Sequence, residues 1–166
     1  MVRLVFPTKT SKDTYLAGMQ ELQESGIALN YDLARASENF DEFLDLLQSY
    51  DDVTKIPAGY VPCLRLWLMD DETFVGNVTI RHWLNEGIRN RGHVGYEIVP
   101  SQRRKGYGKR ALELALLFID EVHIVDGPVE VSCKETNEGS RRIIESCGGK
   151  LLRAEDGLLV YVMPPV

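Results

Sequence analysis

The sequence predicts an α/β protein with a mixed sheet, antiparallel in its middle, and helices packed on both faces. Short runs of alternating apolar and polar residues, rich in β-branched and aromatic side chains, predict strands. Longer segments with apolar residues at helical spacing predict helices. The resulting order is a strand, two helices, three strands, a helix, a strand, a helix and two strands. Consecutive strands with short connections give the antiparallel middle.

Each element of the first third has a local signal. Residues 2–6 are an apolar run that a proline stops, which predicts a first strand. A helix over residues 11–24 begins beside Ser and Asp residues that can cap it. Ser37 can cap a second helix, which runs through apolar residues to Leu47. Residues 51–62 are rich in Asp, Pro and Gly, which predicts a loop.

The middle of the chain predicts an antiparallel hairpin and the strand that follows it. Residues 63–69 and 73–84 are rich in β-branched and aromatic residues on either side of an acidic turn, which predicts the hairpin. A further strand over residues 93–99 is stopped by Pro100. After a short basic segment with two glycines, a helix is predicted over residues 106–122, with apolar residues at helical spacing.

The last third predicts one more helix between strands. Residues 129–133 form a strand after an Asp-Gly-Pro turn, and Asn137 can open a helix that ends near residue 146. Two final strands, residues 150–154 and 158–163, flank a Glu-Asp-Gly turn. The chain contains no internal repeat, low-complexity tract or linker, so we expect a single domain over residues 1–166.

Composition excludes several classes of protein. The 166 residues are 44% hydrophobic and 27% charged, with a formal net charge of −6, which argues against broad nucleic-acid binding. No apolar run is long enough for a membrane span, so we expect no membrane partner. The three cysteines form no paired spacing, which favours a reducing, cytoplasmic location. The three histidines show no metal-binding spacing, so we predict no metal.

A basic segment immediately before the helix at 106–122 is the main candidate binding feature. It contains Arg103, Arg104, Lys105, Gly106, Gly108, Lys109 and Arg110, and no acidic residue. A helix N-terminus already presents unsatisfied N–H groups and the positive end of the helix dipole. Added basic side chains make it a site for a small polyanion. The alternative interpretation is a solvated basic loop.

Two other anion-binding motifs fit this segment less well. A P-loop needs a glycine where Arg103 stands and a Ser or Thr where Arg110 stands. The dinucleotide fingerprint is matched formally by Gly106, Gly108 and Ala111. Its first glycine should lie at the end of a strand, however, whereas five residues separate Pro100 from Gly106. The antiparallel strands upstream also argue against a nicotinamide or flavin site.

The run from Ile98 to Gly108 resembles the acyl-CoA signature of the GNAT superfamily of N-acetyltransferases, at Arg103, Gly106 and Gly108. The later stretch NEGSRRIIESCGG resembles the second motif of that superfamily, with Asn137 opening a helix. In finer detail, residues 81–108 are similar to a bacterial subgroup of predicted acetyltransferases. The resemblance extends over nearly the whole chain and implies the GNAT fold.

The resemblance implies that acetyl-CoA is the acyl donor and that an amine attacks its thioester directly. A backbone N–H group between Tyr96 and Ile98 would face the thioester oxygen, with the strand backbone paired to the pantetheine arm near a bulge. The acceptor would be a small-molecule or peptide amine, bound by a monomer or a homodimer. The implied cofactor-binding residues are Ile98, Val99, Arg103, Arg104, Lys105, Gly106, Tyr107, Gly108, Lys109, Asn137 and Ser140.

Glu97 is the first candidate for the catalytic base, because its carboxylate lies on the central strand just before the cofactor loop. A solvent-facing glutamate is the alternative interpretation. His93 is the second candidate base, since an unperturbed imidazole titrates near pH 6.5. His82, Asn85 and Tyr96 are candidate residues for binding the acceptor, although His82 and Asn85 equally suit loop residues that satisfy backbone groups.

The sequence departs from the superfamily at the general acid. Many members carry a tyrosine seven residues after the motif asparagine, where this chain has Ile144. Tyr107 and Tyr161 are not placed by sequence to replace it, and Cys133 and Cys147 are more typical of core residues than of nucleophiles. A non-catalytic acyl-CoA sensor or assembly subunit is therefore the alternative function. The acidic residues between positions 38 and 52 suggest a cationic acceptor.

Overall fold

A single seven-stranded mixed sheet organises the chain, in the spatial order β1-β2-β3-β4-β5-β7-β6. The computed structural model describes all residues 1–166. Neighbouring strands are antiparallel throughout, except for the parallel pair of β4 and β5. The predicted mixed sheet is confirmed, and the three consecutive strands in the middle of the chain, β2 to β4, pair antiparallel as predicted. The strands are β1 (Val2–Val5), β2 (Cys63–Asp70), β3 (Thr73–Arg81), β4 (Val94–Ile98), β5 (Glu130–Lys134), β6 (Lys150–Glu155) and β7 (Leu158–Val162).

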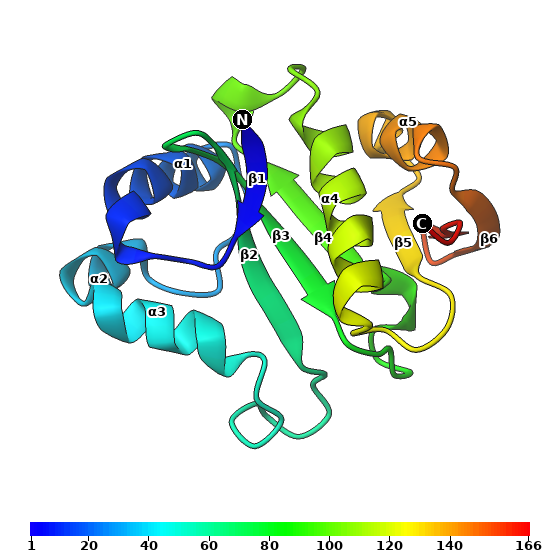
Figure 1. Cartoon of the computed structure of the whole chain (residues 1–166), viewed down its shortest axis with the longest axis horizontal. Helices are drawn as coiled ribbons and strands as arrows, with labels where there is room; N and C mark the ends of the chain where they lie inside the picture. The colour runs from blue at the N-terminus through cyan, green and yellow to red at the C-terminus, as the bar shows by residue number, and fades with distance from the viewer.

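Helices cover both faces of the sheet, with α1 to α3 on one side of the molecule and α4 and α5 on the other (Figure 1). None of them is long and apolar enough to cross a membrane. The α-helices are α1 (Lys12–Glu24), α2 (Leu33–Glu38), α3 (Phe40–Ser49), α4 (Tyr107–Val122) and α5 (Glu138–Ser146). Short 3-10 turns occur at Lys9–Ser11, Arg89–Arg91 and Pro100–Gln102.

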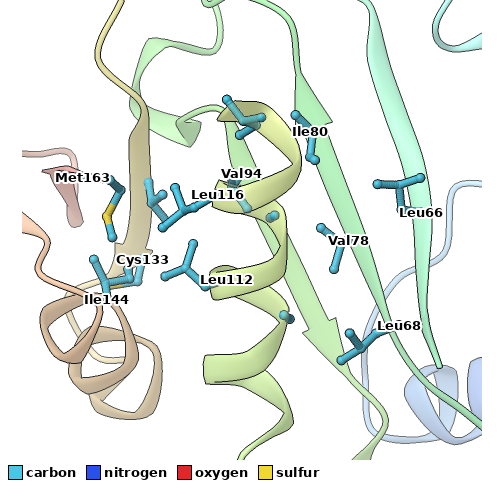
Figure 2. Packing of buried hydrophobic residues seen from close by; sticks show 14 of the residues in the cluster. Leu66, Leu68, Val78, Ile80, Val94, Leu112, Leu116, Cys133, Ile144 and Met163 are labelled. Atoms are coloured by element: carbon cyan, nitrogen blue, oxygen red, sulfur yellow. The ribbon is translucent and has the colours of Figure 1, made fainter. Parts of the chain in front are cut away.

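Two hydrophobic clusters lie on opposite faces of the sheet because side chains alternate along each strand. Leu64, Leu66 and Leu68 of β2 face α4, whose buried residues include Leu112 and Leu116 (Figure 2). From the same strand, Trp67 and Met69 pack with α1 to α3. Strand β2 is therefore apolar on both faces, which makes its one basic residue, Arg65, conspicuous.

The predicted second helix is two helices. Asp32 caps α2 through a hydrogen bond from the N–H of Arg35 at 2.8 Å, so Ser37 lies inside α2 and caps nothing. At Asn39 the backbone angles, φ −123° and ψ 61°, break the helix before α3 begins. The prediction that Ser37 opens this helix was wrong because the true cap lies upstream, in a segment without apolar periodicity.

Candidate active site

The loop between β4 and α4 presents unpaired backbone donors. The backbone N–H groups of residues 104–109 donate to no backbone or side-chain acceptor, and the first helical bond runs from Arg110 to Gly106 at 3.1 Å. Arg104 and Gly106 have positive φ angles of 63° and 86°, which turns the chain tightly around this point. Consecutive free N–H groups at a helix start form a concave anion-binding site.

Side chains around this loop, which we call the phosphate loop (residues 103–109), hold its shape and leave basic charge exposed. Arg103 donates from Nε to the carbonyl of Ile98 at 3.0 Å. Both arginines of the loop, Arg103 and Arg104, are exposed and have no acidic partner. Lys105 donates to Gln102 at 3.0 Å, and Lys109 lies 3.9 Å from a Glu113 oxygen. The loop therefore remains free to take an anion.

Two residues of the loop, Tyr107 and Gly108, make contacts that support the fold. Tyr107 donates its hydroxyl hydrogen to Asp70 at 2.6 Å, so its side chain points to the β2–β3 hairpin and only its backbone N–H serves the loop. A Cβ atom added at Gly108 would lie 2.7 Å from Ile143 of α5. Gly108 is thus needed for the close approach of α4 and α5, in addition to any role toward an anion.

Strands β4 and β5 diverge at the centre of the sheet. They pair at Val94 and Val131, and no register pair follows toward Ile98. Since Val99 donates to the carbonyl of Val75 at 3.0 Å, odd-numbered residues of this strand direct their backbone groups toward β3. The N–H groups of Tyr96 and Ile98 consequently face the opening toward β5.

This opening, the β4–β5 gap, is a pocket of about 420 Å³. It is lined by Tyr96, Cys133, Asn137 and Ser140, among others. Asn137 caps α5 by accepting from the N–H of Ser140 at 3.0 Å, as the sequence predicts for the start of this helix. The hydroxyl groups of Tyr96 and Ser140 lie 2.8 Å apart, and burial raises the pKa of Tyr96 to about 12.

A second pocket of about 420 Å³ lies on the opposite face, between the sheet and α1 to α3; we call it the α1–α3 pocket. Glu97 lines this pocket and is its only carboxylate. Arg81, Gly95 and Tyr96 line both pockets, so the two meet at strand β4. Strand β4 therefore carries Glu97, which lines one pocket, next to Tyr96, which lines both.

The family follows from a model comparison. Residues 4–150 match the family model described as "Acetyltransferase (GNAT) domain". The chain belongs to the GNAT acetyltransferase family. A comparison with curated proteins finds no match.

Solved GNAT structures share the fold. RimJ from Mycobacterium smegmatis, in complex with a CoA disulfide, is 16% identical with a TM-score of 0.68, over 98% of this chain and 81% of that one. PaiA N-acetyltransferase from Thermoplasma acidophilum, in complex with coenzyme A, is 13% identical with a TM-score of 0.59, covering 98% of both chains. A GNAT acetyltransferase from Streptococcus pneumoniae is 14% identical with a TM-score of 0.62, over 98% of this chain and 100% of that one.

The structure does not bring every predicted residue of this GNAT chain to the two pockets. His93 is 7% exposed, its Nδ1 accepts from the N–H of Glu130 at 2.9 Å, and burial lowers its pKa. It lies outside both pockets, at the opposite end of β4 from Glu97, so the second candidate base is not in place. Val99 also fails as a backbone donor to the cofactor, because Val75 takes its N–H.

His82 and Asn85 act as loop residues in this GNAT structure. A ring nitrogen of His82 contacts the carboxylate of Asp51, and the side chain of Asn85 donates to the carbonyl of Gly59 at 2.8 Å. These contacts tie the loop after β3 to the loop before β2. Neither residue lines the α1–α3 pocket, so their predicted role in binding the acceptor is not supported.

No tyrosine replaces the usual GNAT acid at the positions considered from sequence. Ile144 lies on the inner face of α5 and is fully buried in the core. Tyr161 donates its hydroxyl hydrogen to Glu145 at 3.0 Å and does not line the β4–β5 gap. Burial raises the pKa of the thiols of Cys133 and Cys147, which disfavours the reactive thiolate. No group of three or more potential metal-ligating side chains comes together in the structure.

Replacing Ile144 by the tyrosine that many family members carry is therefore expected to destabilise the protein without raising its activity. Overpacking a core typically costs about 1–3 kcal/mol, and a buried hydroxyl without a partner adds to this. We expect the melting temperature of Ile144→Tyr to fall by roughly 5 °C or more. Arg142→Tyr, an exposed position of the same helix, is the matched control and should change it little. A faster, equally stable Ile144→Tyr would contradict this.

Two basic residues of the α1–α3 pocket were not predicted as site residues from the sequence. Arg65 of β2 and Arg81 of β3 line it together with Glu97. The acidic residues between positions 38 and 52 lie outside this pocket, and several are paired elsewhere, such as Asp41 with Lys9 at 2.7 Å. The pocket's charges therefore do not support the expectation of a cationic acceptor. The sequence contained one signal for this pocket, namely Arg65, the one basic residue of the otherwise largely apolar strand β2.

Proposed function

We propose that this GNAT chain transfers an acetyl group from acetyl-CoA to an amine, by direct attack of the amine on the thioester. The observation that carries the proposal is the meeting of the two pockets at β4. One pocket is the β4–β5 gap, beside the strand that leads into the phosphate loop, and the other holds a carboxylate. The acceptor is a small molecule or a peptide end with a free amine.

The donor would bind along the phosphate loop and the β4–β5 gap. The N–H groups of residues 104–109 would hold the diphosphate, with Arg103 and Arg104 adding charge-assisted contacts. The unpaired backbone N–H groups of Tyr96 and Ile98 suit the amide carbonyls of the pantetheine arm, as an added strand would. One of these N–H groups would also stabilise the oxyanion that forms at the thioester carbon.

Glu97 would accept the proton of the attacking amine, directly or through a water molecule. Its side chain faces the α1–α3 pocket, while its strand neighbours Tyr96 and Ile98 direct N–H groups into the gap. In this proposal one strand would supply both the base and the oxyanion donors, on opposite sides of the reacting carbon. The arrangement supports positioning as a main source of catalysis.

Tyr96 would stabilise the departing thiolate. Its hydroxyl lies in the gap beside Ser140, and a pKa near 12 keeps it protonated at neutral pH. Because an ordinary thiol has a pKa of about 8.5, complete proton transfer from this phenol is uphill. Its role is therefore to donate a hydrogen bond to the sulfur, while solvent supplies the proton.

Tyr96→Phe is expected to lower kcat about tenfold and leave acetyl-CoA affinity nearly unchanged, since the hydrogen bond forms mainly with the leaving thiolate. Stopped-flow or steady-state thiol release measures kcat, and calorimetry measures affinity. Tyr161→Phe is the matched control, because that phenol also loses one hydrogen bond but lies outside the gap. Equal turnover in Tyr96→Phe and wild type would remove Tyr96 from the mechanism.

Ligand-dependent melting and thiol release test the function together. Acetyl-CoA and CoA should raise the melting temperature, whereas NAD and FAD should not. Thiol release over a panel of amines should then require the acceptor, and the product should carry an acetyl group by mass. Binding of acetyl-CoA without release for any amine would favour a non-catalytic sensor, which the buried Ile144 at the usual acid position would suit. Absence of binding would contradict both functions.

A further inference from the structure

The two arginines of the α1–α3 pocket lie on the same wall of the sheet as Glu97, with Arg65 one row of side chains away and Arg81 two rows away. Arg65 pairs across β2 and β3 with Thr79, and Thr79 pairs with Gly95 of β4. Glu97 is two residues beyond Gly95 on the same strand, which is about 7 Å along it. Arg81 is two residues beyond Thr79 in the opposite direction. The carboxylate and the two guanidinium groups thus line successive rows of one pocket wall.

Neither arginine has an acidic partner. Arg65 makes one hydrogen bond, from Nη1 to the hydroxyl of Thr79 at 2.9 Å, and its guanidinium lies 5.0 Å from the centre of the Tyr50 ring. Its Nε atom is buried without a hydrogen-bond partner. Arg81 also makes one, from Nη1 to the carbonyl of Gly92 at 3.0 Å. Each guanidinium has five N–H donors, so most remain free.

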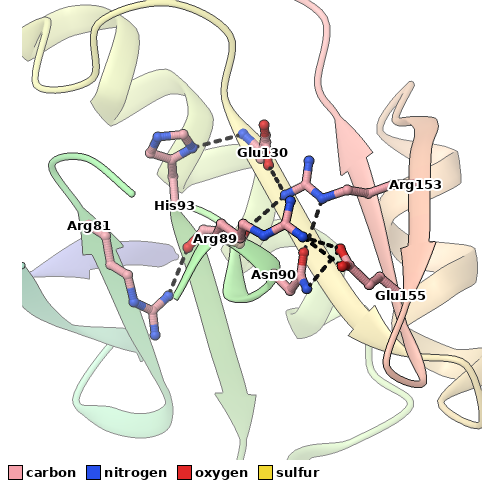
Figure 3. A network of polar contacts seen from close by, with 8 residues as sticks. Arg81, Arg89, Asn90, His93, Glu130, Arg153 and Glu155 are labelled. Atoms are coloured by element: carbon pink, nitrogen blue, oxygen red, sulfur yellow. Dashed lines mark hydrogen bonds and ion pairs between the residues drawn. The ribbon is translucent and has the colours of Figure 1, made fainter. Parts of the chain in front are cut away.

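Other partly buried arginines nearby are neutralised. Figure 3 shows Arg89 with the carboxylate of Glu155 and Arg153 with that of Glu130, at 2.6 Å and 2.8 Å. Arg81, in the same view, contacts only a backbone carbonyl. Arg89 and Arg153 are therefore paired with carboxylates of β5 and β6. The two arginines of the α1–α3 pocket have no such partner.

Unpaired charge at this position is unfavourable without a ligand. Burial is the largest effect and lowers the pKa of Arg81; Cys63 raises it, and the guanidinium groups of Arg65 and Arg91 lower it further. Removing charges from water without a counter-charge destabilises a protein. Tyr50 and Thr79 hold Arg65 in place, which gives the pair a fixed geometry. A bound anion would satisfy both groups at once.

We propose that Arg65 and Arg81 bind a carboxylate of the acceptor, so that the substrate is a free amino acid or a close relative in which a few carbons separate amine and carboxylate. This inference rests on the proposed acetyl transfer and names its acceptor class. With the carboxylate on the two guanidinium groups, the amine points along the pocket wall toward Glu97 and the β4–β5 gap. A polyamine would instead meet two uncompensated positive charges.

Matched acceptors test the carboxylate directly. Thiol release from acetyl-CoA is measured with L-amino acids, with their carboxamides, and with the corresponding decarboxylated amines. We expect kcat/KM for the best amino acid to exceed that of its carboxamide at least tenfold, since a charge-assisted bond is lost. A peptide with an acidic first residue and an amidated end tests a peptide-borne carboxylate. Turnover of that peptide in preference to every free amino acid would overturn the proposal.

Variants locate the effect at the two arginines. Arg65→Met and Arg81→Met should each raise KM for the amino acid at least about tenfold and change KM for its carboxamide little. Arg65 lines only the α1–α3 pocket, so Arg65→Met should also leave acetyl-CoA affinity unchanged. Arg35→Met is the matched control, because Arg35 is exposed on α2. Arg65→Lys, which keeps the charge but not the planar fork, should recover part of the loss. Equal losses for amino acid and carboxamide would show that the arginines are only structural.

A binding arm separates this proposal from the proposed function. Calorimetry measures the affinity of N-acetylated amino acids and of their carboxamides for the CoA-bound protein. Preference for the carboxylate supports the proposal even where turnover is slow, and absence of preference overturns it. Efficient acetylation of amines that lack a carboxylate would also overturn it and would leave acetyl transfer intact. Failure to bind acetyl-CoA would instead remove the proposed function.

Discussion

Replacing Arg103 and Arg104 together by glutamate is expected to weaken acetyl-CoA binding at least about a hundredfold. Both side chains are exposed, have no acidic partner, and flank the free N–H groups of residues 104–109. A hydrogen bond to a charged group contributes about 1.5–3 kcal/mol, and each 1.4 kcal/mol is a factor of ten in affinity. Reversed charges would also repel the diphosphate. Calorimetric titration with acetyl-CoA measures the loss.

The control for this variant carries the same change in net charge elsewhere. Lys9 and Arg35 are exposed on the face of α1 to α3, so Lys9→Glu with Arg35→Glu should leave acetyl-CoA affinity nearly unchanged. The loop variant should also melt close to wild type in the absence of ligand. Equal losses of affinity in both double variants would mean that overall charge, rather than the phosphate loop, governs binding.

Glu97→Gln is expected to lower kcat at least about tenfold near neutral pH. General base catalysis typically contributes about 100-fold to 10,000-fold, so a tenfold loss is a conservative expectation. An alkylamine has a pKa near 10, so most of it is protonated at neutral pH and a base must take up its proton. As pH rises, the free amine accumulates, and the variant should recover part of its turnover. Thiol release measured from pH 7 to pH 10 gives the profile.

The same substitution at an exposed turn is the matched control for this profile. Glu72→Gln lies between β2 and β3, outside both pockets, and should behave as wild type at every pH. The acetyl-CoA affinity of Glu97→Gln should be unchanged. A loss that is the same at all pH values would assign Glu97 to acceptor binding, and no loss would make it a surface residue.

The sequence was informative wherever a local signal determines the structure. Period-two runs, turn residues and the Asn137 cap predicted the strands and the last helix correctly. The break at Asn39 was missed because no proline or glycine marks it, and only the backbone angles there separate α2 from α3. The predicted strand over residues 73–84 ends at Arg81, where the next residues bind the loop before β2.

The site was predictable as a set of motifs but not as a geometry. The phosphate loop follows from residues 103–109 alone, because its donors are local backbone groups. The β4–β5 gap depends on where two distant strands stop pairing, and no local pattern encodes that. For the same reason Glu97 could be assigned to a pocket only from the structure. The role of His93 was overestimated because its burial depends on Glu130 from another strand.

The most direct test of acetyl-CoA binding at the phosphate loop is the backbone amide NMR spectrum recorded with and without acetyl-CoA. We expect the largest shifts at residues 104–109 and at Tyr96 and Ile98, whose N–H groups are free in the loop and the gap. Residues of the pocket beside the C-terminus, such as Val125 and Val166, should not respond. Shifts concentrated there, with residues 104–109 unchanged, would contradict acetyl-CoA binding at the phosphate loop and the transfer chemistry built on it.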